Sequence, residues 1–271
     1  MFFFRLSSLE LGLLIFAVIF AATGAGVLLG WRHRHRSETL REPFGALQGA
    51  LLGVVGLLLA FGLALAVDRY EGRRQDVVTE ANAIGTTYLR AQFLGEPART
   101  QSLRLLVRYA DGAILLTRTV PGSNAENAVE RQQLQLERRL WARAGRALRR
   151  APVASAPRLY VETLNEMFDA QDARVAGLDN RVPTPVLLLE VLGSAAALAL
   201  LSFYLSILGR GLLTVAMAAV LVTLLLLVTF DLDRPARGLI TVPSGALANV
   251  RASMNQPPAA GPAVGPVPSQ N

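Results

Sequence analysis

One stretch decides the fold: PFGALQGALLGVVGLLLAFGLALAVDRYEGRRQDVVTEANAIGTTYLR, from Pro43 to Arg90. Its first half holds 24 residues, Phe44 to Val67, whose only strongly polar side chain is Gln48. An apolar run of this length exceeds the roughly 20 residues that a helix needs to cross a bilayer core. No proline or turn cluster separates it from the charged second half. We therefore expect a membrane helix that continues as a rigid lever into the soluble part.

Small residues recur on one face of this helix. At about 100° per residue they fall within an arc of roughly 80°. They are Gly45, Gly49, Gly53, Gly56 and Ala60. Such a face lets another backbone approach closely, which predicts a helix-packing or pore-facing surface. The alternative is that membrane helices are simply rich in glycine and alanine.

Composition places the chain among membrane proteins. Of 271 residues, 52% are apolar and none is cysteine, and the formal charge is +7. The lack of cysteine excludes disulfides, thiolate catalysis and cysteine-ligated metals. All 27 basic residues are arginine, and they flank apolar spans, which favours membrane orientation over nucleic-acid binding. We expect the lipid bilayer as a partner and no nucleic acid.

The chain reads as an all-α membrane protein with four transmembrane helices, two N-terminal and two C-terminal. The N-terminal pair (1–67) has spans at about 11–30 and 44–67, and the C-terminal pair (186–230) has spans at about 186–208 and 212–230. A cleaved signal peptide is the alternative for 11–30, but that run exceeds the usual 7–15-residue apolar region and a second span follows at once.

Between the pairs, residues 68–185 show helical periodicity and no alternating strand pattern. One predicted buried face is formed by Val77, Ala81, Ile84 and Tyr88. A juxtamembrane segment (231–254) and a disordered, Pro/Ala/Gly-rich tail (255–271) complete the chain. Eight arginines near the span ends against five favour an inner-membrane protein with its termini and middle region in the cytoplasm, although the arginine count alone does not settle the orientation.

Several polar positions stand out. Gln48 and Glu190 lie within predicted spans, and intramembrane polar residues are functional candidates by default. A second set is expected to form an interhelical or intersubunit polar network, with surface charge as the alternative: Glu80, Asn82, Arg90, Asn165, Glu166, Arg174, Asp231, Asp233 and Arg234. Asp231 and Asp233 should need partners, because acids at a helix C-terminus oppose the macrodipole.

No metal or other cofactor is expected. The acidic stripe from Glu162 to Asp172 has the oxygen chemistry of a Ca²⁺ site, but helical carboxylates more often pair with arginine. His33 and His35 point apart on a helix and lack a third ligand. There is no HExxH, GxSxG or phosphate-binding loop with lysine, so we expect no enzyme.

Four segments carry a family resemblance: Arg73–Leu94, Leu106–Gly112, Glu162–Val182 and Thr229–Val242. With the two-plus-two spans, they resemble the bestrophin-like domain family of bacterial membrane proteins over about residues 40–250. In the segment that starts at Leu106, Gly112 and Ala113 follow the aspartate where the family pattern has a charged residue. The family is remotely related to bestrophins, homopentameric anion channels whose second membrane helices line the pore.

This resemblance implies a homo-oligomeric, pentameric ion channel. The alternative function is a non-conducting scaffold or sensor whose cytoplasmic helices bind a partner. In bestrophins an acidic stretch after the last span binds Ca²⁺, but its spacing differs from that around Asp231, so no Ca²⁺ site is carried over.

Overall fold

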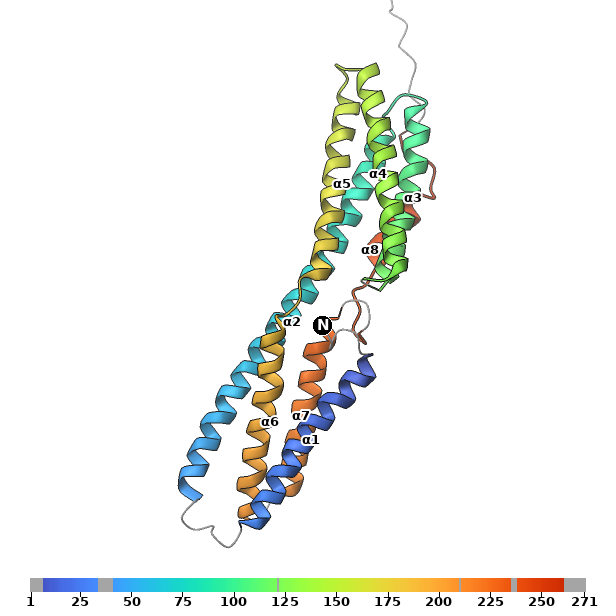
Figure 1. Ribbon diagram of the computed structural model, residues 1–271. Coiled ribbons are helices and arrows are strands. Elements are labelled where there is room, and N and C mark those ends of the chain that lie inside the picture. The colour runs from blue at the N-terminus through green and yellow to red at the C-terminus, as the bar shows by residue number, and fades with distance from the viewer. Residues whose placement is uncertain (1–6, 34–40, 121, 210, 235–237, 261–271) are drawn as a thin grey trace, which may run out of the picture. The chain divides into compact units, whose positions relative to one another are not determined.

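The computed structural model describes residues 7–33, 41–120, 122–209, 211–234 and 238–260 (Figure 1). Within these ranges the ordered elements are all helices. They are α1 (Ser8–Arg32), α2 (Arg41–Ala91), α3 (Ala98–Arg118), α4 (Asn124–Arg150), α5 (Ser155–Asp179), α6 (Thr184–Ile207), α7 (Leu212–Leu232) and α8 (Gly245–Ser253). The predicted all-α fold class is confirmed. So is the uninterrupted helix from the first apolar run into the charged segment, since α2 spans 51 residues.

Four helices of the described chain are long and apolar enough to cross a membrane, as the sequence predicted. Their spans are Leu9–Arg32, Gly45–Ala91, Thr184–Ile207 and Leu212–Leu232. Two lie before and two after the middle helices. The chain divides into two compact units: residues 1–70 with 181–241, and residues 71–180 with 242–271.

Helices α1, α6 and α7 lie side by side in the first unit (Figure 1). Two glycines one turn apart set the α1–α6 contact. A Cβ added to Gly26 would overlap the Ala199 carbonyl and the Ser202 hydroxyl, and one added to Gly30 would approach the Phe203 carbonyl oxygen to 2.6 Å. The Ser202 hydroxyl also donates to the Thr23 carbonyl at 2.9 Å. This is small-xxx-small packing of the kind found between membrane helices.

Local sequence explains where the helices of this unit start and turn. Ser7 and Glu10 form a capping box that satisfies two of the free amides at the start of α1. The Gly209–Gly211 connection joins α6 to α7, and both glycines adopt positive φ, +73° and +92°. A side chain would be strained at either position.

The second unit is a bundle of α3, α4, α5 and the C-terminal part of α2, with α8 against α3. The predicted face of α2 is confirmed, because Val77, Ala81, Ile84 and Tyr88 are all buried. Tyr109 and Tyr160 are the largest fully buried side chains. In the predicted tail, Ala260 contacts this unit: its amide donates to Gln92 Oε1 at 3.0 Å, and its carbonyl accepts from Arg99 at 2.8 Å. Residues 261–271 lie outside the described ranges.

Candidate functional site

The outward face of α2 is divided into two adjoining arcs, one of small residues and one of large apolar side chains. Gly49, Gly53 and Gly56 have open space where a Cβ would stand. The neighbouring arc carries large exposed side chains: Leu47, Val54, Leu57, Phe61 and Leu65, all at least 40% exposed. Both arcs face away from the rest of the first unit. Within the described chain no atom lies within 4 Å of a Cβ built at Gly49, Gly53 or Gly56, whereas a Cβ at Gly45 would meet the Tyr204 hydroxyl at 3.3 Å.

The opposite side of α2 packs inward through Val55, Leu59 and Ala66. Its partner is α6, which runs antiparallel to it: Gly45 faces Tyr204, and Gly62 faces Glu190. Gln48 lies on this packed side, seven residues before Val55, and its buried Oε1 has no hydrogen-bond partner among the described residues.

Glu190 is the most unusual side chain of the membrane helices. It is only 1% exposed. Neither carboxyl oxygen has a hydrogen-bond partner within the described chain, and neither does the Ser194 hydroxyl one turn along α6. The carboxyl group occupies the space left by the missing side chain of Gly62. Burying a carboxyl group without a hydrogen-bond partner costs free energy, so Glu190 is not expected to stabilise the fold.

In the second unit, the predicted polar network contains one fully buried ion pair. Arg174 donates to both carboxylate oxygens of Glu80, and the two side chains are 3% and 0% exposed. Burial raises the pKa of Glu80, and the Arg174 guanidinium opposes that rise. Thr87, two turns along α2, donates to the Ala83 and Thr163 carbonyls. These contacts join α2 to α5.

A chain of amide side chains runs from this core towards the surface. Gln133 Nε2 donates to the Tyr109 carbonyl and to Gln171 Oε1, and Gln171 Nε2 donates to Glu137 Oε1 at 2.8 Å. Burial is the main reason that the pKa of Glu137 is raised, and the charges of Asp172 and Glu80 add to it. Burial also raises the pKa of Tyr109. No sequence pattern pointed to these two glutamines, which lie on different helices, Gln133 on α4 and Gln171 on α5.

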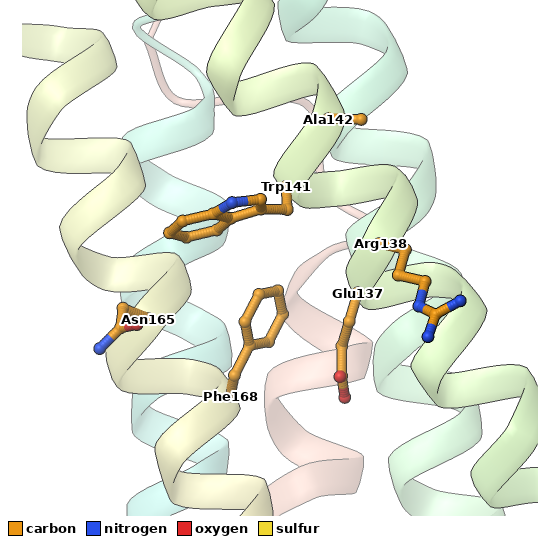
Figure 2. A pocket seen from close by; sticks show the side chains of 6 residues that line it. All are labelled: Glu137, Arg138, Trp141, Ala142, Asn165 and Phe168. Atoms are coloured by element: carbon orange, nitrogen blue, oxygen red, sulfur yellow. The ribbon is translucent and has the colours of Figure 1, made fainter.

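This series of hydrogen bonds ends at Glu137, which lines an aromatic groove between α4 and α5 (Figure 2). The groove has a volume of about 360 Å³ and is lined by Glu137, Arg138, Trp141, Ala142, Asn165 and Phe168. Trp141 and Phe168 point toward one another, with ring centroids 6.2 Å apart. Phe168 also contacts the buried Tyr109, at 6.3 Å between centroids. Asn165, a predicted network residue, lies at the rim and donates to Asp169 at 3.0 Å.

The other predicted network residues of this unit lie on its surface. Arg90 donates to the Leu159 carbonyl at 3.0 Å and lies 3.7 Å from Glu162. Asn82 and Glu166 are exposed. Within the described chain no group of three or more His, Cys, Asp or Glu side chains could hold a metal.

The acids at the end of α7 are held by backbone amides of the first unit. Asp231 accepts hydrogen bonds from the Leu239 and Ile240 amides at 2.9 and 2.8 Å, and Asp233 accepts one from the Val182 amide at 3.0 Å. Both acids and Arg234 are buried. The close approach of Gly238 to Asp231, which leaves no room for a Cβ without displacement, explains the glycine in the DRPARG segment.

Two-plus-two membrane helices around a helical middle region define a polytopic, all-helical membrane protein. The profile of the Bestrophin-like domain matches residues 15–247, and the chain belongs to this family.

Solved structures share the fold. A bacterial bestrophin homologue from Klebsiella pneumoniae, phased with zinc, aligns with a TM-score of 0.63 and 15% identity over 87% of this chain and 97% of that one. A point-mutant form of the homologue aligns with a TM-score of 0.64 and 16% identity over 87% and 95%. None of the curated proteins matches the chain significantly.

Proposed function

We propose that the protein assembles as a homo-oligomer in which the small-residue face of α2 surrounds an ion pathway. The observation that carries this proposal is the divided outward face of α2, with open space at Gly49, Gly53 and Gly56 beside a row of large apolar side chains. A helix that only met lipid would have no reason to separate small from large residues. Helices that converge around an axis need the small residues on the axial side.

Family membership supports the same arrangement. In bestrophins the second membrane helices line a pore shared by five subunits, so a pentamer is the expected assembly by analogy. Anions are the proposed cargo for the same reason. The formal charge of the chain is +7, and all 27 of its Lys and Arg residues are arginine. This excess of positive charge is consistent with a field that attracts anions. The proposal requires no reaction chemistry and no cofactor.

The proposed location is the inner membrane, with both termini and the middle region in the cytoplasm. The arginine distribution around the spans supports this orientation. A thiol introduced at exposed Val153, in a chain without cysteine, would be protected from an impermeant reagent in intact cells and labelled after lysis. Labelling in intact cells would contradict the orientation.

Chloride flux from liposomes tests the function itself. Chloride-loaded vesicles that contain the purified protein should release chloride faster than chloride-loaded vesicles without protein. The protein that conducts should be an oligomer. Absence of flux with several salts and at several pH values would contradict the proposed channel function.

A second function is favoured by one observation, the aromatic groove of Figure 2. Trp141 is 47% exposed there, and partly exposed tryptophans are common anchors of protein partners. In that case the protein is a scaffold or sensor whose middle helices bind a partner. It would show no flux, and Trp141→Ala would abolish partner binding.

A further inference from the structure

A second, strongly basic pocket lies between α3 and α4. It has a volume of about 460 Å³ and is lined by Arg108, Ala128, Arg131, Gln132, Gln135, Leu136 and Arg139. Three guanidinium groups and two carboxamides thus share one concave surface. Its size falls within the range of small-molecule sites.

None of the three arginines has a carboxylate partner within the described chain. The only acid of α3 is Asp111, and Arg251 of α8 binds it at 2.6 Å. On α4, Glu126, Glu130 and Glu137 all lie roughly 100–140° from Arg131, on the side away from Arg139. The positive charge of this pocket is therefore not neutralised by the helices that form it.

The α3–α4 hairpin holds the three arginines in register. Gln133 donates to the Tyr109 carbonyl, and its side chain fills the space above Gly112, which fixes the antiparallel alignment. This alignment brings Arg108 level with the turn of α4 that carries Arg139. Leu136, 2% exposed, anchors that turn in the core. Groups positioned by rigid helices lose less entropy when a ligand binds.

We propose that this pocket is a binding site for a small, phosphate-rich anion. A guanidinium donates two parallel hydrogen bonds to a phosphate group, so three of them suit a ligand with several phosphate groups better than a monovalent anion. Gln132 and Gln135 supply amide donors for the remaining oxygens. The anion is either a soluble oligophosphate or the headgroup of a phosphorylated lipid, which share this chemistry.

Calorimetric titration of the full-length protein with inorganic triphosphate tests the site. Saturable binding is expected in zwitterionic detergent at low salt. Arg108→Gln, Arg131→Gln and Arg139→Gln should each weaken it about tenfold or more, the usual cost of losing a charged hydrogen-bond pair. Arg104→Gln on α3 and Arg150→Gln on α4 remove the same charge from exposed positions outside the pocket and should change the Kd less than about twofold. Unchanged melting temperatures show that the variants are folded.

Two further arms identify the source of the anion. Competition by nanodiscs that contain a phosphorylated inositol lipid, but not by plain phosphatidylcholine nanodiscs, identifies a headgroup; no competition identifies a soluble ligand. The proposal is overturned if triphosphate does not bind, if the control variants weaken binding as much as the pocket variants, or if an oligonucleotide binds more tightly than triphosphate at equal phosphate concentration. The readout is binding, so it is independent of ion conduction.

Discussion

At the scale of single residues, Glu190 and Gly62 depend on one another. The carboxyl group lies where any side chain at position 62 would stand. Gly62→Ala should therefore destabilise the protein by about 1–3 kcal/mol, the usual cost of an overpacked interior. Thermal unfolding in detergent measures this effect.

Gly72→Ala on the same helix is the matched control, because no described atom lies within 4 Å of a Cβ at position 72, which is outside the small-residue arc. In the Glu190→Ala background, Gly62→Ala should lose most of its cost, since the group it displaces is gone. Equal destabilisation in both backgrounds would show that the two residues are not coupled.

Glu137 should make stability depend on pH. Burial, with the charges of Asp172 and Glu80, raises its pKa in the folded state above its value in the unfolded chain. The folded state then binds the proton more tightly, so this contribution is complete below the ordinary pKa of 4.5 and is lost as pH rises through the raised value. The melting temperature of the wild type should fall more between pH 4.5 and 7 than that of Glu137→Gln, whose amide oxygen still accepts from Gln171. Parallel pH profiles would contradict this assignment.

The spacing of residues along the sequence predicted which side chains are buried better than it predicted which side chains pair with one another. The spacing of Val77, Ala81, Ile84 and Tyr88 was sufficient to identify a buried face, because helix geometry alone decides it. The Glu80–Arg174 pair was not predictable as a pair. The two residues are 94 positions apart, and only the antiparallel register of α2 and α5 brings them together.

At the scale of elements, the same glycine pattern occupies two opposite environments. Gly26 and Gly30 of α1 are pressed against α6, whereas Gly49 and Gly53 of α2 are open. The sequence shows which face of a helix carries small residues, but not which helix packs against that face. The packing partner depends on how segments far apart in the chain fold together. The contact of α1 with α6 was missed for this reason, although its four-residue spacing is visible in GAGVLLG (Gly24–Gly30).

A pair of alanine substitutions tests the α1–α6 contact. Gly26→Ala would force α1 away from the Ala199 carbonyl and should cost about 1–3 kcal/mol. Gly24→Ala, half a turn away in open space, should be neutral or stabilising by up to about 1 kcal/mol through helix propensity. The difference in melting temperature between the two variants is the measurement. Equal melting would mean that the helices are not closely packed at Gly26.

At the scale of the whole molecule, the outward face of α2 should matter only in the assembly. Gly53→Leu places a large side chain in open space, so the protomer should fold normally. The oligomer should dissociate or change size, because a leucine on the axial side of every copy of α2 prevents the helices from converging as closely around the axis. Light scattering after size exclusion in detergent measures the mass. Ala50→Leu, an exposed position outside the small-residue arc, is the control and should leave the mass unchanged.

In the assembled channel we expect the small-residue arc of α2 to face an aqueous pathway and the large-residue arc to face away from it. Because the chain has no cysteine, single cysteines can be introduced one at a time at Gly49, Gly53, Val54 and Leu57 and exposed to a charged, water-soluble thiol reagent during chloride flux. Modification should be fast and should abolish flux at Gly49 and Gly53, whereas at Val54 and Leu57 it should be slow and leave flux unchanged. Equal reactivity on both arcs, or inhibition only from the large-residue arc, would contradict this arrangement.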